Sequence, residues 1–145
     1  MRVEDLRIDF EPQADGAARQ FIINNVDGHN IAATGLAAFY PISLFLRSAQ
    51  GELLGGLLGY VWGGWLQVQY LWVAEVVRKQ GHATGLMDTA EAYAIARGCT
   101  AATLETHSFQ ARPFYEKRGY VVVGTLEGYP PGHAKYFLRK TLGPV

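Results

Sequence analysis

Apolar and polar residues alternate along three consecutive stretches in the middle of the chain. Residues 42–49, 53–62 and 65–73 follow the two-residue period of β-strands, and Gln50-Gly51 and Gly63-Gly64 separate them as turns. In the third stretch one face holds Trp65, Gln67, Gln69, Leu71 and Val73. The other face holds Leu66, Val68, Tyr70 and Trp72. Apolar residues on both faces predict a central strand that is covered on both sides.

The second half of the chain changes to helical spacing and back. Apolar residues recur at helical intervals from 81 to 97, and Gly98 follows as a helix stop. A short strand is expected over 101–105, and a helix with Ser108 as N-cap is expected to run to Lys117. Strands over 120–126 and 136–142 then flank a loop. The order of elements predicts an α+β fold in which a mixed sheet packs against helices.

The first forty residues carry weaker patterns. Residues 6–10 alternate and are expected to form a strand, and residues 15–30 are expected to form a helix with Phe21, Ile22 and Val26 on one face. Residues 30–40 fit either a second short helix or a loop. Because no repeat or linker interrupts the chain, we predict a single domain over residues 1–145.

Composition excludes several classes of protein. Nearly half of the 145 residues are apolar and the formal net charge is zero, which favours a globular domain. Since no run of Lys and Arg exceeds two residues, no nucleic-acid partner is expected. The longest apolar run is short and broken by glycines, and the N-terminus is charged throughout, so no membrane partner or signal peptide is expected. The single Cys99 excludes an internal disulfide and fits a cytoplasmic location.

The segment Val73 to Leu86, VAEVVRKQGHATGL, carries the strongest chemical signal. Its pattern predicts the end of a strand, then a basic turn with a glycine, and then the start of a helix. Such a turn directs free backbone N–H groups, the positive end of a helix dipole and nearby cations at one point. The segment therefore predicts a binding site for a phosphate or pyrophosphate.

Two motifs make the chain resemble the GNAT superfamily of N-acetyltransferases. The first is Arg78-x-x-Gly81-x-Ala83, directly after a strand that ends in Val. The second is the segment SFQARPFYEKRGY from Ser108 to Tyr120. The resemblance covers roughly residues 41–142 and implies the GNAT fold, a mixed central sheet with helices on both faces. The closing YPPGHAKYFLRK is similar to one bacterial branch of small GNAT proteins.

The resemblance implies that acetyl-CoA is the co-substrate. It would lie where the strand ending at Val73 separates from the strand ending near Glu105, with its pantetheine arm paired to the backbone of Leu71, Trp72 and Val73. The turn would wrap the pyrophosphate with Arg78, Lys79, Gln80, Gly81, His82, Ala83 and Thr84. Gly81 would let the backbone approach closely. Ser108 stands where many members have an Asn that contacts the cofactor, so it either makes that contact or only caps the helix.

The resemblance also implies a catalytic role for Tyr115. Its phenol would act as general acid and give a proton to the departing thiolate. The alternative is a core aromatic residue whose hydroxyl is satisfied elsewhere. Cys99 begins a strand and is not placed as a nucleophile, so direct transfer in a ternary complex is expected.

The general base is less clearly indicated. Gln67 and Gln69 stand on the central strand, where other members often carry a carboxylate, and they can hold a water molecule rather than accept a proton. Glu105 ends the next strand and is the candidate base, acting directly or through water. The alternative for Glu105 is a solvated or ion-paired carboxylate.

The resemblance further implies that the acceptor site lies near the loop 127–133. Candidate substrate contacts are Gln67, Gln69, Glu127, Tyr129 and His133. Neither His107 nor His133 has a partner at metal-ligand spacing, so no metal is expected. The alternative for the loop is a rigid connection that only closes the sheet.

Together these residues predict an enzyme, an acetyl-CoA-dependent N-acetyltransferase that acts on a primary amine of a small molecule. The alternatives are a protein N-terminal or lysine acetyltransferase, and a CoA-binding sensor without turnover. Exposed strand edges and an aromatic-rich second half also predict a homodimer.

Overall fold

The computed structural model describes residues 2–13 and 15–143. The chain divides into two compact units, with the boundary between Ala37 and Ala38. The first unit contains a short 3-10 helix, η1 (Val3–Asp5), and the helix α1 (Gly16–Thr34). Asp15 caps α1, since its carboxylate accepts a 2.7 Å hydrogen bond from the Ala18 N–H. Gly35 ends the helix in the left-handed conformation at φ 72°. Residues 30–34 therefore complete α1, and residues 35–39 form a loop rather than a second helix.

The strand predicted over residues 6–10 is wrong. This segment forms no strand and pairs with none of the described strands. A strand needs a neighbour for its backbone hydrogen bonds, and alternation alone does not supply one. The sequence segment thus has the period of a strand without the pairing that defines a sheet.

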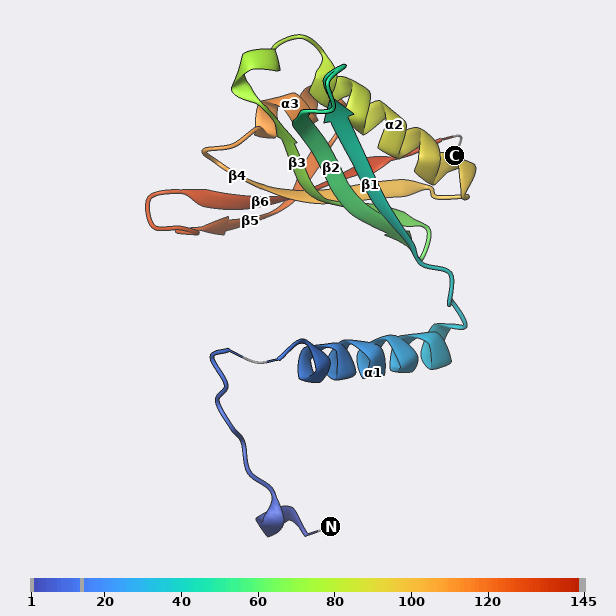
Figure 1. The fold of residues 1–145 in the computed structure, drawn as a ribbon, viewed down its shortest axis with the longest axis vertical. Helices are drawn as coiled ribbons and strands as arrows, with labels where there is room; N and C mark the ends of the chain where they lie inside the picture. Colours follow the sequence, from blue (N-terminus) through green and yellow to red (C-terminus); the bar gives the residue numbers. More distant parts are fainter. Residues whose placement is uncertain (1, 14, 144–145) are drawn as a thin grey trace. The chain divides into compact units, whose positions relative to one another are not determined.

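The second unit is built on one six-stranded mixed sheet (Figure 1). Its strands are β1 (Tyr40–Arg47), β2 (Leu53–Trp62), β3 (Trp65–Val73), β4 (Ala101–His107), β5 (Val121–Glu127) and β6 (Ala134–Thr141). They lie in the order β1-β2-β3-β4-β6-β5, and only the β3–β4 pair is parallel. This arrangement confirms the predicted fold class, and β2 and β3 have the predicted boundaries.

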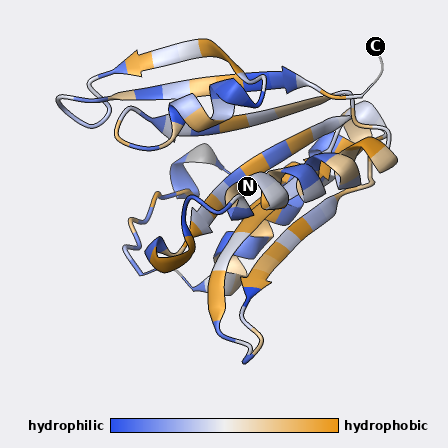
Figure 2. Cartoon of the chain, turned by 90° about the horizontal axis from the view of Figure 1, so that it is seen from above, coloured by the Kyte–Doolittle hydropathy of each residue, from blue (hydrophilic) through white to orange (hydrophobic). Residues whose placement is uncertain are grey.

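Three helical elements lie between the strands. They are the 3-10 helix η2 (Glu75–Val77) and the α-helices α2 (His82–Ala96) and α3 (Arg112–Lys117). The helix α2 packs against β1, β2 and β3. The buried core of the sheet and helices includes Leu57, Leu66, Met87, Ala90, Leu104 and Leu138. Figure 2 shows the long hydrophobic stretches in the strands and the hydrophilic turns between them. No helix in the described part of the chain is both long and apolar enough to cross a membrane.

A β-bulge in β3 changes the predicted faces of this strand. Leu58 pairs with Tyr70 and Gly59 pairs with Val68, so Gln69 has no partner in β2. The buried side chains are Leu66 and Val68 before the bulge and Val73 after it, whereas Tyr70 and Trp72 are exposed. The strict alternation predicted over residues 65–73 is therefore wrong beyond Val68, because one extra residue reverses the two faces.

The helix α3 begins later than predicted. It starts at Arg112, and its preceding residue Ala111 makes no side-chain cap. Ser108 is not the N-cap, because its hydroxyl instead accepts a 3.0 Å hydrogen bond from the Ala134 N–H at the start of β6. The side chain of Gln110 accepts a 2.7 Å hydrogen bond from the His107 N–H, which ties the segment before α3 into a separate turn.

Candidate active site

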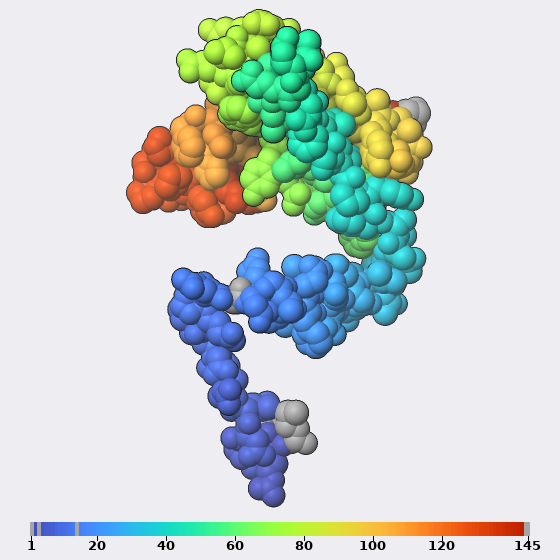
Figure 3. Space-filling model, viewed as in Figure 1, coloured from blue at the N-terminus to red at the C-terminus, as the bar shows by residue number. Residues whose placement is uncertain are grey.

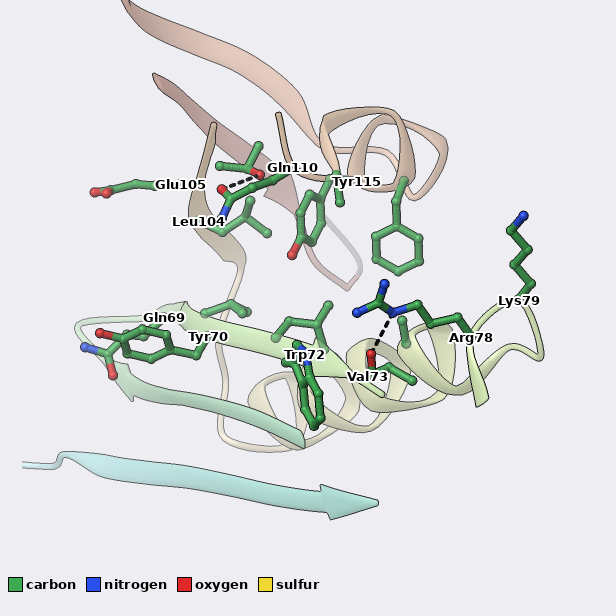
Figure 4. A pocket seen from close by; sticks show the side chains of 16 residues that line it. Gln69, Tyr70, Trp72, Val73, Arg78, Lys79, Leu104, Glu105, Gln110 and Tyr115 are labelled. Carbon is green, nitrogen blue, oxygen red and sulfur yellow. Dashed lines mark hydrogen bonds between the residues drawn. The ribbon is translucent and has the colours of Figure 1, made fainter. Parts of the chain in front are cut away.

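Two parallel strands separate at the centre of the sheet. β3 and β4 are paired only from Trp65 and Ala101 to Val68 and Leu104, although both continue for several residues. Beyond this point a cavity of about 710 Å³ opens between them (Figure 4). Residues 68–73 form one wall, and residues 104–106 with part of α3 form the other. The cavity lies where the family resemblance implied that the two strands separate.

The turn before α2 forms a second hollow of about 310 Å³, which shares several lining residues with the first. Lys79 and Gly81 both have left-handed backbones, with φ values of 61° and 85°. A Cβ atom added to Gly81 would meet no described atom within 4 Å, so the space beside this residue is open. No described side chain caps α2, so its first backbone N–H groups stay available. The Arg78 Nε donates a 2.8 Å hydrogen bond to the Val73 carbonyl and holds the guanidinium at the junction of the two hollows.

These features fit a pyrophosphate with an extended arm. The cations, the free helix N-terminus and the open space at Gly81 suit the phosphates, and the unpaired end of β3 suits an amide-bearing arm. Most of the predicted cofactor residues line one hollow or both: Leu71, Trp72, Val73, Arg78, Lys79, Gly81, His82, Ala83 and Thr84. Gln80 and Ser108 line neither.

Tyr115 lies in α3 with only 7% of its surface exposed. Its hydroxyl points into the large cavity from the wall opposite β3 (Figure 4). Its ring packs against Phe114 and Tyr120 with centroids 5.1 Å and 5.9 Å away. Burial raises the pKa of the Tyr115 phenol, so the group keeps its proton at neutral pH. The side chain is therefore a protonated donor directed into the cavity.

A polar pocket of about 540 Å³ adjoins the large cavity. Both are lined by Val68, Gln69, Tyr70, Glu105 and Gln110. The pocket alone is lined by Tyr60, Gln67, His107 and Lys135. The structure brings the predicted residues Gln67, Gln69 and Glu105 to one pocket. It adds Tyr60, Gln110 and Lys135, which the sequence analysis did not name.

Glu105 forms an ion pair in this pocket. Its carboxylate lies 2.8 Å from the Lys135 Nζ, with the Glu105 side chain 46% exposed and the Lys135 side chain 18% exposed. The hydrogen bond to Glu105 raises the pKa of the Lys135 ammonium. Lys135 also lies over the Tyr129 ring at 4.9 Å from its centroid. No local motif could have revealed this pair, because the two residues are distant in sequence and meet only through the β4–β6 pairing.

The predicted acceptor loop lies beside the segment that follows β4, as the space-filling view shows (Figure 3). Tyr129 packs against the His107 ring at 5.7 Å between centroids, and the His133 Nδ1 lies 3.4 Å from the Ser108 hydroxyl. Tyr129 and His133 thus lie near the polar pocket without lining it. Glu127 pairs with Ala134 at the end of the β5–β6 hairpin and lines neither the pocket nor the large cavity.

A buried charged cluster behind α3 was not predicted. Glu91 of α2 accepts a 2.7 Å hydrogen bond from Arg118 and a 2.5 Å one from Lys140, and the Tyr120 hydroxyl donates to it at 3.3 Å. Arg118 also pairs with Asp88 at 2.8 Å. The cluster joins α2, the end of α3 and β6, and therefore holds the helix that carries the catalytic candidate. Among residues 2–13 and 15–143, no group of His, Cys, Asp and Glu side chains could hold a metal ion.

Comparison with known proteins identifies the class of protein. The sequence model of the Acetyltransferase (GNAT) family matches residues 4–120. Acetyltransferase Atu2258 of Agrobacterium fabrum is 33% identical over 127 residues, which cover 88% of this chain and 93% of that protein. Blasticidin-S acetyltransferase of Streptomyces morookaense is 42% identical over 106 residues, covering 70% of this chain and 78% of that protein.

A solved structure agrees with these relatives. The crystal structure of a protein assigned as an acetyltransferase from Agrobacterium tumefaciens has a TM-score of 0.88 and 31% identity, with 94% of this chain and all of that chain covered. The chain therefore belongs to the GNAT acetyltransferase family, and it is an acetyltransferase with the GNAT fold. The family uses acetyl-CoA. The family match also reaches into the first forty residues, well beyond the region that carried the resemblance in sequence.

Proposed function

We propose that the protein transfers the acetyl group of acetyl-CoA to a primary amine of a small molecule, by direct attack in a ternary complex. One observation carries this proposal. A cavity suited to an acyl-CoA contains the Tyr115 hydroxyl and adjoins a polar pocket. The cavity and the pocket share a wall that includes Glu105. The similarity to a relative named blasticidin-S acetyltransferase supports an acceptor of small size.

The residues of the site have separate roles in this proposal. Acetyl-CoA supplies the acetyl group as a thioester. The turn from Arg78 to Thr84 binds the phosphates, and Gly81 leaves room for them. Tyr115 holds a proton on its phenol and donates it to the departing sulfur.

The acceptor side of the site removes a proton from the amine. An alkylammonium has a pKa near 10 and must lose a proton before it attacks. Glu105 accepts that proton directly or through a water molecule held by Gln67 and Gln69. The ion pair with Lys135 keeps the carboxylate at the side of the pocket where the amine arrives.

The first experiment measures thiol release from acetyl-CoA with a panel of acceptors. The panel contains blasticidin-S, amino acids, polyamines, aminoglycosides and peptides, and acetyl-CoA binding is measured by calorimetry on the same protein. Turnover with a small amine supports the proposal. Turnover only with peptides would favour the alternative, a protein acetyltransferase, and binding of acetyl-CoA without any turnover would favour the sensor.

Tyr115→Phe tests the general acid. We expect kcat to fall by about 100-fold while the Kd for acetyl-CoA changes little, because only the hydroxyl is removed. Tyr93→Phe is the matched control, since Tyr93 packs under the Arg97 guanidinium in α2 and lines neither cavity nor pocket. Equal kcat values for Tyr115→Phe and the control would remove Tyr115 from the mechanism. The homodimer, the cytoplasmic location and the single domain remain predictions.

A further inference from the structure

The polar pocket contains one formal charge of each sign. Of its lining residues, Glu105 is the carboxylate and Lys135 is the ammonium, and their charged atoms lie 2.8 Å apart. The remaining lining is amide, phenol, imidazole and apolar surface. A ligand that enters this pocket therefore meets a compact pair of opposite charges rather than a net charge.

The two charges differ in their distance from the reacting group. Glu105 lines both the large cavity and the polar pocket, whereas Lys135 lines only the pocket. The rings of Tyr129 and Phe137, with centroids 4.9 Å and 5.4 Å from the Lys135 Nζ, hold the ammonium in place. The negative charge thus lies at the wall shared with the large cavity, and the positive charge lies on the side of the pocket away from that cavity.

We infer that the acceptor is a zwitterion of the amino-acid type, with its amine and its carboxylate separated by one or two carbon atoms. The ammonium pairs with Glu105 at the opening to the cavity, and the carboxylate pairs with Lys135 deeper in the pocket. The short separation follows from the short distance between the two protein charges. This inference rests on the proposed function and names the acceptor class of the same site.

The pairing of opposite charges explains why such an acceptor is preferred. A zwitterion replaces one internal ion pair by two pairs with the ligand, so no charge loses its partner. An amine without a carboxylate takes Glu105 and leaves Lys135, whose side chain is mostly buried, without a counter-charge. A polyamine additionally brings cations for which the pocket has no carboxylate.

The test compares acceptors that differ only in the carboxylate. L-phenylalanine, L-phenylalaninamide and phenethylamine share the ring and the primary amine, but only the first carries a carboxylate. We expect kcat/KM for L-phenylalanine to exceed that for the other two by about 10- to 100-fold, which is the range of one charged hydrogen bond. Equal kcat/KM values for the three acceptors would overturn the inference.

Variants of Lys135 test whether this residue causes the preference for an acceptor with a carboxylate. Lys135→Met keeps the length of the side chain and should reduce the ratio of kcat/KM values to near one, whereas Lys135→Arg should keep most of it. Lys117→Met is the matched control, because Lys117 is an exposed lysine that lines neither the pocket nor the large cavity. A ratio that survives in Lys135→Met would contradict the inference.

A binding measurement separates this inference from the proposed function. Saturation-transfer NMR detects L-phenylalanine and phenethylamine on the CoA-saturated protein, with and without Lys135→Met. Binding of L-phenylalanine that depends on Lys135, together with an absence of turnover, would refute the proposed function but support the zwitterion site. Absence of any preferential binding of L-phenylalanine would refute the zwitterion site even if other amines are acetylated.

Discussion

Removing the charge of Glu91 is the most informative perturbation of stability. The Glu91 side chain is 9% exposed, and its partners Arg118 and Lys140 are 12% and 23% exposed. In Glu91→Gln the shape is kept, but the two cations lose the one counter-charge that they share among the described residues. Asp88 still pairs with Arg118, but its side chain is 64% exposed and so compensates little.

The expected cost follows from the burial of these groups. Breaking a buried ion pair by removing one partner costs about 3–5 kcal/mol, because the other charge stays buried without compensation. Since Lys140 retains some contact with solvent, we expect about 3 kcal/mol. For a chain of this length that corresponds to a fall in Tm of about 10 °C.

Urea denaturation followed by tryptophan fluorescence measures this cost. All three tryptophans lie in β2 and β3, so the signal reports the sheet of the second unit. Glu116→Gln is the control, because its ion pair with Arg112 spans 2.9 Å but both side chains are about 40% exposed. That pair should contribute less than about 0.5 kcal/mol.

A double-mutant cycle with Arg118→Met isolates the pairwise contribution. If the cluster acts as described, the coupling energy between Glu91 and Arg118 should be at least about 1 kcal/mol. A cost for Glu91→Gln that is no larger than that of Glu116→Gln would refute the reasoning. It would mean that water reaches the cluster and that the burial of Glu91 does not increase the contribution of its ion pairs to the free energy of unfolding.

Two further predictions concern the sheet and the buried phenols. Gly59→Ala should destabilise the protein by about 2–3 kcal/mol, because the new Cβ would lie 2.2 Å from the Gln67 carbonyl opposite the bulge. Gly85→Ala in α2, where an added Cβ meets nothing within 4 Å, should instead stabilise it by about 0.5–1 kcal/mol, and urea midpoints compare the two. Burial raises the pKa of both Tyr115 and Tyr120, so above pH of about 10 the unfolded chain releases protons that the folded chain keeps. Stability should therefore fall as pH rises beyond that value, and a urea midpoint that stays constant from about pH 9 to pH 11 would contradict this assignment.

The sequence predicted the elements that depend on local patterns. Alternation and glycine turns located β2 and β3, and helical spacing located α2 to within one residue of its ends. The basic turn before α2 was also recognisable, because its glycine and cations are neighbours in sequence, and phosphate binding at this turn remains a prediction. Local chemistry of this kind is visible without knowledge of the fold.

Features that depend on pairing between distant segments were missed. The bulge at Gln69 arises from the register between two strands, and it moves Tyr70 and Trp72 to the opposite face. Ser108 is a residue type that often caps helices, but here its hydroxyl accepts a hydrogen bond from the backbone N–H of Ala134. The ion pair of Glu105 requires the β4–β6 pairing, which no local pattern encodes.

The charged cluster behind α3 has a consequence for the choice of acyl donor. The helix α2 starts at the phosphate turn, and through Glu91 it is joined to Arg118, which directly follows the helix that carries Tyr115. On the proposed function, this link fixes the distance between the turn that binds the phosphates and the phenol of Tyr115 that donates the proton. We therefore expect the enzyme to select acyl carriers by the distance between their phosphates and their thioester sulfur, as well as by their chemistry.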